Sequence, residues 1–354
     1  MSVITYKCPN CGGSVVYDPE SRLFACEYCL SKFAQGEFSG DEQSAGNESN
    51  VQPEVQEPKM EQNMMLYRCP NCGAEIITDE TTAATFCFYC HAPVVLAGRL
   101  EGEYLPDGII TFEYTKEQAI EKFQKWIQGK KFIQKGFYSE KNIEKMTGVY
   151  FPYWLYYCET DNYIVGNSKD IHVSRVGDIE HTETKIYQVS RSAKIDFRYI
   201  PRNALLKAQS DLLKGIFPFE FGALKKFHMD FLAGFQAEKR DVEKEGIQDG
   251  IRQTAKTYAN ARMRNTVSGH ASFSLSDQTC RIEEEHFQYV LLPVWILTYK
   301  GFGKEPYYFA MNGQTGEVAG KLPVNYFKIN VFCMIVFWVI FILLLLIFSG
   351  GTMS

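Results

Sequence analysis

The sequence lacks the excess of basic residues that is typical of nucleic-acid-binding proteins. Its 354 residues contain 37 Lys and Arg against 42 Asp and Glu, which gives a net charge of −5. Phosphate binding is driven largely by counterion release and therefore needs clustered Lys and Arg side chains. The composition argues against nucleic acid as a partner of this chain.

The sequence also lacks the short motifs of common catalytic sites. It contains no nucleophile motif, no glycine-rich phosphate loop and no open set of three metal ligands. We interpret the Glu-Glu-Glu-His run at 283–286 as a solvated charged turn, and Cys158 and Cys280 as buried, inert thiols. We therefore expect no enzymatic activity and identify no small-molecule substrate. An enzyme whose site is built from scattered residues stays an alternative.

Two further absences bear on localisation. No apolar leader segment opens the chain, and no charged residue occurs between positions 329 and 348. Twenty residues of α-helix rise about 30 Å, which is the thickness of a bilayer's hydrocarbon core. We therefore expect residues 329–348 to cross the lipid bilayer as a single transmembrane helix. Six residues follow this segment, which is typical of tail-anchored proteins.

Cysteine, by contrast, is abundant and regularly spaced. Eight of the 11 cysteines form two units with the same C-x2-C-x14-C-x2-C spacing: Cys8, Cys11, Cys26 and Cys29, then Cys69, Cys72, Cys87 and Cys90. Four thiolates satisfy a tetrahedral zinc ion and leave no open position for catalysis. Each unit is too short to build its own core, so the metal must supply much of the folding energy, on the order of 10 kcal/mol or more. The spacing predicts two structural Zn²⁺ ions, one in each of two zinc ribbons.

Other interpretations of the cysteine units are weaker. A rubredoxin-type iron site uses similar turns and remains an alternative. A redox dithiol does not account for four pairs at a repeated spacing. Glycine after Cys11 and Cys72 fits a turn that requires a permissive backbone. His91 follows Cys90, but the matching position in the first unit is Leu30, so we interpret His91 as a surface residue.

The chain divides into five predicted segments. Zinc ribbons occupy 1–33 and 66–99, and residues 34–65 between them form an acidic linker with seven acidic residues and one Lys. Such a linker buries too little apolar surface to order, so we expect it to be disordered and to let the first ribbon search roughly 30 Å. Residues 103–325 are predicted to form an α+β domain with a mainly antiparallel sheet, which the transmembrane helix at 329–348 follows.

Several elements of the α+β domain can be placed from local signals. Thr115 and Gln118 form a capping box before a helix that Gly129 ends. A long helix is expected near 243–264 and a shorter one over 203–214. Strand-like runs include YWLYYC, YIVG, TKIYQVS, FSLS and YVLLPVWILTY, and Asn312-Gly313 marks a hairpin.

Two strand-like segments of this domain also resemble each other. VYFPYWLYY at 149–157 and VLLPVWILT at 290–298 share Val, Pro and Trp at a constant offset of 141 positions. Chance between two aromatic strands would give the same match. If the match is real, the two segments belong to two halves of one sheet.

At the runs CPNCG and C-x-Y-C, the sequence resembles bacterial zinc-ribbon proteins of the TFIIB type. The runs LAGFQAEKRDV, YFPYW, LLPVWILTY and YYFAMNGQTGEVAGKLP resemble a narrower family of bacterial membrane proteins with zinc ribbons, some labelled as replication proteins. Members of that family are linked to envelope-stress systems of the phage-shock type, where membrane-anchored proteins recruit a peripheral coat. The resemblance therefore implies protein partners at a membrane.

Charge next to the apolar segment predicts the orientation of the chain. Lys321 and Lys328 precede the segment and no basic residue follows it, so the positive-inside rule leaves the N-terminal bulk in the cytoplasm. Reduced thiolates favour the same compartment. We expect a membrane-anchored zinc-ribbon adaptor that assembles protein partners at the cytoplasmic face of the cell membrane. The alternative function is a membrane-associated nucleic-acid-binding protein.

Overall fold

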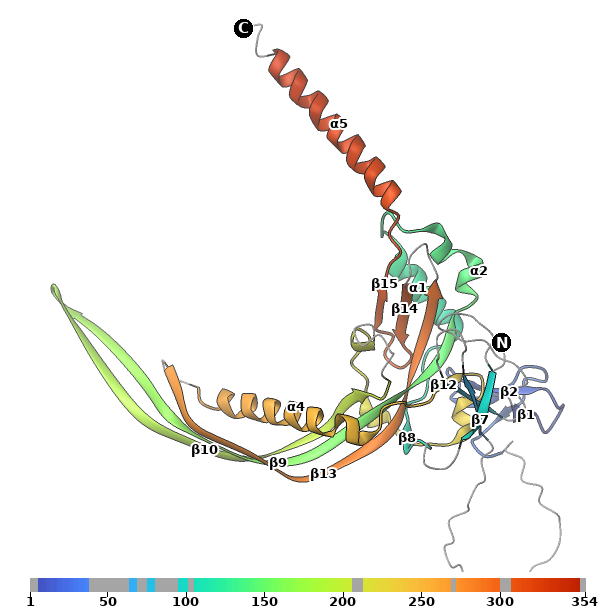
Figure 1. The fold of residues 1–354 in the computed structure, drawn as a ribbon, viewed down its shortest axis with the longest axis horizontal. Helices are drawn as coiled ribbons and strands as arrows, with labels where there is room; N and C mark the ends of the chain where they lie inside the picture. Colours follow the sequence, from blue (N-terminus) through green and yellow to red (C-terminus); the bar gives the residue numbers. More distant parts are fainter. Residues whose placement is uncertain are drawn as a thin grey trace, which may run out of the picture.

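The structure, a computed structural model, consists of a small sheet, a large sheet that extends into a curved arm, and a last helix that leaves the body by itself (Figure 1). It describes residues 6–37, 64–68, 75–79, 95–100, 105–205, 213–268, 272–299 and 307–350. The small antiparallel sheet has the order β1-β2-β3-β4, formed by Tyr6–Lys7, Ser14–Asp18, Leu23–Cys26 and Lys32–Phe33. We call this sheet with its connecting turns ribbon 1.

The large sheet is mainly antiparallel, as the sequence predicts. In the parts of the chain that the structure describes, its path is β11-β8-β13-β9-β12-β6-β5-β7, with β10 on β9 and with β14 and β15 beside β13. The strands are β5 (Met64–Arg68), β6 (Glu75–Asp79), β7 (Val95–Leu100), β8 (Gly108–Ile109), β9 (Thr147–Val176), β10 (Ile179–Asn203), β11 (Lys225–Lys226), β12 (Gln236–Glu238), β13 (Ser272–Tyr299), β14 (Tyr307–Asn312) and β15 (Val318–Lys321). The β12–β9 and β13–β8 pairs are parallel.

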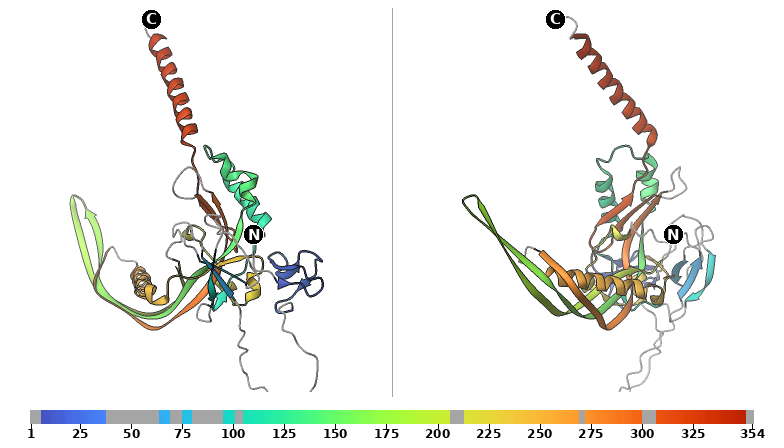
Figure 2. Two further views of the ribbon diagram at one scale, coloured as in Figure 1. Left: turned by 45° about the vertical axis from the view of Figure 1, so that its right-hand side comes forward. Right: turned by 60° about the vertical axis from the view of Figure 1, so that its left-hand side comes forward.

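Strands β9, β10 and β13 continue far beyond the body as a three-stranded arm (Figures 1 and 2). They are 30, 25 and 28 residues long. The sequence predicts several shorter strands here, because polar residues such as those at 159–162 interrupt the apolar runs. In the structure these four residues are consecutive in one strand and their burial alternates: Thr160 and Asn162 are buried, while Glu159 and Asp161 are exposed.

Helix α4 (Lys244–Asn265) lies along the concave face of the arm (Figure 1). Its buried residues recur every fourth position, at Ile251, Ala255, Ala259 and Met263, which places a narrow row of small and apolar side chains on the sheet. The helix matches the prediction near 243–264. Because α4 covers this face, the inward side chains of the arm form a core of their own.

The first helix of the large domain, α1 (Lys116–Ile127), confirms the predicted cap. The Thr115 side chain accepts a hydrogen bond from the Gln118 N–H, and the Gln118 side chain accepts one from the Thr115 N–H. Gly129 follows with φ +80°, a backbone conformation that favours glycine. Most of the helix expected over 203–214 lies outside the described residues, although Asn203 ends β10.

Short helical turns and the last helix complete the fold. The turns are η2 (Lys135–Tyr138), α2 (Glu140–Ile143), η3 (Phe221–Ala223) and η4 (Met229–Leu232), and the last helix is α5 (Tyr326–Gly350). The predicted hairpin is confirmed: β14 and β15 flank a turn in which the Asn312 side chain accepts hydrogen bonds from the N–H groups of Gln314 and Thr315.

The two similar segments noted in the sequence pair directly with each other. In the β9–β13 register, Val149 lies opposite Val294 and Tyr150 opposite Pro293. Both segments are buried and supply the centre of the sheet, where Phe112 stacks on Phe235 with ring centroids 4.1 Å apart. The segments therefore belong to one sheet and are adjacent strands within it.

Candidate metal centre

Ribbon 1 presents its four cysteines on two tight turns. In the first turn the Cys8 N–H donates to the Gly13 carbonyl over 2.7 Å, and the Gly12 N–H donates to the Cys8 carbonyl over 2.8 Å. Gly12 has φ +73°, so the glycine after Cys11 is required by the backbone, as the sequence predicts. These bonds aim the two sulfur atoms of the C-x2-C pair to the same side.

The second turn repeats this geometry without a glycine. The Cys26 N–H donates to the Ser31 carbonyl over 2.9 Å, and the Leu30 N–H donates to the Cys26 carbonyl over 3.0 Å. Leu30 occupies the left-handed region with φ +59°. A side-chain hydrogen bond of 3.0 Å from Asn10 to Ser31 joins the two turns. Antiparallel pairing of Val15 with Cys26 returns the chain to the first turn.

The four sulfur atoms form a cluster of the size that a tetrahedral metal ion requires. All four lie within 4.8 Å of one another. The Sγ atoms of Cys8 and Cys29 are 3.6 Å apart, and those of Cys11 and Cys26 are 3.4 Å apart. Thiolates about 2.3 Å from a central zinc ion would have sulfur–sulfur distances of about 3.8 Å. The residues present therefore fit a closed metal site with four cysteine ligands.

Hydrogen bonds shift the pKa values of the Cys29 and Cys11 thiols in opposite directions. The Ser31 hydroxyl, then its N–H and then Cys11, lower the pKa of the Cys29 thiol to about 6. The Gly13 N–H lowers the pKa of Cys11, but the thiols of Cys29 and Cys26 raise it more, to a net value of about 12. The Cys29 thiolate therefore forms readily and ionisation of Cys11 is opposed, so a bound cation would be needed to hold both residues as thiolates.

The structure describes only the strands of the second cysteine unit and not its cysteines. Cys69, Cys72, Cys87, Cys90 and His91 all lie outside the described residues. The strands that flank them are described: β5 pairs with β6 and β7, and β6 pairs with β12 of the large domain. The described strands that flank these cysteines thus belong to the large sheet, whereas ribbon 1 is a separate sheet.

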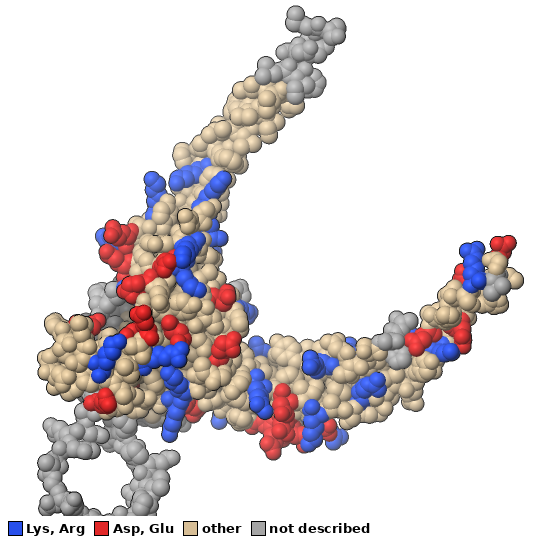
Figure 3. Space-filling model, turned by 180° about the vertical axis from the view of Figure 1, so that it is seen from behind, with Lys and Arg blue, Asp and Glu red and all other residues tan. Residues whose placement is uncertain are grey.

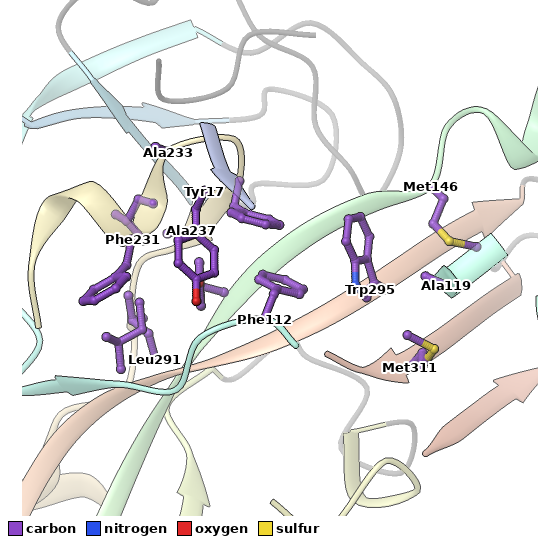
Figure 4. Close-up of a cluster of buried hydrophobic side chains, with 14 of the residues drawn as sticks. Tyr17, Phe112, Ala119, Met146, Phe231, Ala233, Ala237, Leu291, Trp295 and Met311 are labelled. Carbon is purple, nitrogen blue, oxygen red and sulfur yellow. The ribbon is translucent and has the colours of Figure 1, made fainter. Parts of the chain in front are cut away.

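Ribbon 1 packs firmly against the large domain, and this corrects the prediction of a first ribbon that searches space on its linker. Tyr17 and Phe24 of ribbon 1 contact Phe231 with ring centroids 5.9 and 6.0 Å apart. All three rings are at most 5% exposed. Figure 4 shows Tyr17 reaching into the cluster that contains Phe231 and Phe112. Buried aromatic contacts of this kind were invisible in the sequence because Phe231 is far from ribbon 1 along the chain.

Polar contacts fix the orientation of ribbon 1 on the domain. The Tyr17 N–H donates to the Ala233 carbonyl over 3.1 Å, and Arg22 pairs with Glu113 over 2.6 Å. At the end of ribbon 1, the Gly36 N–H donates over 3.2 Å to the carboxylate of Asp230, which is 1% exposed. Two of the four clustered cysteines, Cys8 and Cys26, are buried in the same cluster. The candidate metal site is therefore next to a core that the two sheets share.

Outside the ribbons, the structure agrees with the interpretation of the two cysteines but not with that of the acidic run at 283–286. Cys158 is buried and Cys280 is half-buried, and burial raises the pKa of both thiols, as expected for unreactive cysteines. The prediction of a turn at 283–286 is wrong, because these residues lie within β13. Glu285 accepts hydrogen bonds from Arg252 and from the Tyr156 hydroxyl, the latter over 2.6 Å.

This carboxylate fastens α4 to the arm. Arg252, then Tyr156 and Gln248, hold the pKa of Glu285 at about 2, although burial acts in the opposite direction. Gln248 and Arg252 both belong to α4, and Tyr156 belongs to β9. The sequence signal that could have found this network is the alternation of β13, which places Glu285 on the same face as the partly buried Phe287.

Helix α5 is the second feature with functional meaning. Its segment Tyr326–Leu344 has a mean hydropathy of 2.5 and none of it is buried against the rest of the chain. It is long and apolar enough to cross a membrane, and it contains the first part of the predicted span. Figure 3 shows no charged side chain on the visible face of α5 beyond its base.

These observations define a class of protein with a cysteine cluster suited to a metal, a mainly antiparallel sheet and an exposed apolar helix. The chain is 30% identical to the uncharacterized protein YdjG of Bacillus subtilis (strain 168) over 344 residues, which cover 92% of each chain. It therefore belongs to the same family as YdjG. No family model and no solved structure matches the chain.

Proposed function

We propose that this protein is a membrane-anchored zinc-ribbon adaptor that assembles protein partners at the cytoplasmic face of the cell membrane. The observation that carries the proposal is the exposure of α5. Side chains such as Phe337, Trp338 and Ile342 are more than half exposed. Each would gain about 1.5–3 kcal/mol on burial in an apolar medium, and a bilayer supplies one along the whole helix.

Charges at the base of α5 support a cytoplasmic body. Lys321 and Lys328 flank the start of the helix, and cytoplasmic flanks are enriched in Lys and Arg. The same compartment keeps thiols reduced, which four ligating cysteines require. In this proposal ribbon 1 holds one structural Zn²⁺ ion through Cys8, Cys11, Cys26 and Cys29, and the second cysteine unit holds another.

The exposed end of ribbon 1 offers a place for a protein partner. Tyr28 and Leu30, which flank Cys29 in the second turn, are 81% and 77% exposed. The hydrogen-bonded turn holds the backbone of both residues in place, so a partner would not need to order this part of the chain on binding. Ribbon 1 carries no net charge between residues 1 and 33, which suits a protein better than a nucleic acid. We propose that such a partner acts in a membrane stress response, which is what the resemblance to envelope-stress proteins implies.

Site-specific photo-cross-linking in cells tests this proposal. A photoreactive amino acid at Tyr28 is expected to give discrete adducts with other proteins in the membrane fraction. The matched control is the same amino acid at Tyr258, which is 55% exposed on α4. Equal adducts at both positions, or a protein that alkaline carbonate extracts from the membrane, would contradict the adaptor. Adducts with DNA or RNA at Tyr28 would favour the nucleic-acid alternative.

A further inference from the structure

Both long edges of the arm lack a neighbouring strand among the described residues. Strand β10 pairs with β9 and with no other described strand along Ile179–Asn203. Strand β13 pairs with β9 on one side and meets β8 and β14 on the other side only from Val290 onward. An unpaired edge of this length presents a row of backbone N–H and C=O groups, which is a template for another strand.

The two edges carry opposite charge. From 185 to 203, β10 has five basic residues and one acidic residue: Lys185, Arg191, Lys194, Arg198 and Arg202 against Asp196. From 272 to 288, β13 has four acidic residues and one basic residue: Asp277, Glu283, Glu284 and Glu285 against Arg281. Arg202 and Glu285 are engaged with α4, and Lys185 pairs with Glu183 of its own strand over 3.4 Å. Without these three residues, β10 keeps a net charge of +2 and β13 keeps −2.

These charges occupy the same stretch of the arm. Across β9, Lys194 lies opposite Asp161, and Glu284 lies opposite Glu159, two positions away. Lys194 and Glu284 are both exposed. Two copies that met through β10 and β10, or through β13 and β13, would place like charges together, whereas β10 against β13 places opposite charges together.

We propose that a second copy of this chain docks on the arm, with β10 of one copy pairing with β13 of the next. Both strands run antiparallel to β9, so they run in the same direction and their pairing across copies is parallel. Because the pairing is parallel, neighbouring copies have the same orientation, and α5 leaves every copy towards the same side. Each copy keeps one free edge of each sign, so the contact is heterologous and extends to further copies.

Charge reversal with the full-length chain in mild detergent tests this contact. The first variant carries Arg191→Glu and Lys194→Glu on β10, and the second carries Glu283→Lys and Glu284→Lys on β13. By analytical ultracentrifugation, the wild type is expected to associate with rising concentration and each variant to associate at least about tenfold more weakly. Mixing the two variants is expected to restore association. The acidic β10 of the first variant then meets the basic β13 of the second, and the unchanged β10 of the second meets the unchanged β13 of the first.

A control and a cross-link complete the test. The variant Lys244→Glu with Arg262→Glu changes charge on α4, away from both edges, and should associate like the wild type. Carbodiimide treatment of mixed unlabelled and ¹⁵N-labelled wild-type chains should join Lys194 of one copy to Glu283 or Glu284 of another. A wild type that stays monomeric, a mixture that fails to recover association, or mixed-isotope cross-links from Lys194 to Asp196 alone would overturn the proposal.

Discussion

Phe231 is the side chain through which ribbon 1 is held, and its truncation gives the sharpest test of the shared core. Phe231 is 5% exposed and contacts both Tyr17 and Phe24 of ribbon 1. A buried Phe→Ala substitution costs about 3–5 kcal/mol. The Arg22–Glu113 pair, with Arg22 66% exposed, contributes less than about 1 kcal/mol, and the Tyr17 amide bond contributes about 1 kcal/mol. Truncating Phe231 therefore costs more than the loss of either of these two polar contacts.

For Phe231→Ala we expect ribbon 1 to detach before the domain unfolds. A loss of about 3 kcal/mol in the free energy of opening accelerates exchange of the amides that it protects about 100-fold. The Tyr17 amide, which donates to Ala233, is the reporter. Hydrogen exchange followed by mass spectrometry of peptides covering 14–26 measures the effect in the metal-loaded protein.

The matched control is Phe309→Ala. Phe309 is fully buried and packs on Phe123 and Trp126, away from ribbon 1. It should lower overall stability by a similar amount without a selective effect on residues 14–26. If both variants accelerate exchange in ribbon 1 equally, or if Phe231→Ala leaves it unchanged, the aromatic contacts do not hold ribbon 1 and the shared-core account is wrong.

Three further outcomes are expected. The pKa of Glu285 is lowered to about 2, so its stabilising effect is complete above the unfolded pKa of about 4.5 and is lost as pH falls towards 2. After solvent screening, we expect the free energy of unfolding to fall by about 1–2 kcal/mol through this group. Urea unfolding between pH 6 and pH 3 measures the loss, which should be absent in Glu285→Gln. Gly234 has φ +89°, and a Cβ added there would lie 3.1 Å from Val16 of ribbon 1. Gly234→Ala should therefore lower the free energy of unfolding by about 1–3 kcal/mol, seen as a lower melting temperature and faster amide exchange in ribbon 1. Val339→Arg should move protein from the carbonate-resistant membrane fraction to the supernatant, because arginine at a span centre costs about 2.5–3.5 kcal/mol.

Features that depend on neighbouring residues were predictable from the sequence. The cap at Thr115, the stop at Gly129 and the turn at Gly12 follow from local backbone chemistry, and the structure confirms all three. The clustering of the four cysteines of ribbon 1 was predictable for the same reason, because C-x2-C spacing directly encodes a turn that aims two sulfur atoms to one side. The apolar run at 329–348 needs no partner to form a helix, and α5 contains all of it.

Features that depend on distant residues were not predictable. The length of the arm could not be inferred, because the polar residues of β9 are tolerated only where β10, β13 and α4 surround them. The role of Glu285 depends on Arg252, which precedes it by 33 positions and approaches it only when α4 lies on the arm. The charges of β10 and β13 are visible in the sequence, but only the structure shows that the two strands flank β9 and form opposite edges of one arm.

The four cysteines of ribbon 1 lie close to the aromatic contacts that dock it on the large domain. Cys8 and Cys26 lie in the same buried cluster as Phe24, which contacts Phe231 of the large domain. In the proposed function, a structural zinc ion would contribute on the order of 10 kcal/mol or more to a ribbon of this size, more than any single contact that docks it. We therefore propose that the metal sets whether ribbon 1 is folded, and that folding sets whether the aromatic surface around Phe231 is covered. A ribbon that stayed docked after chelation would show that the large domain, and not the metal, holds its fold.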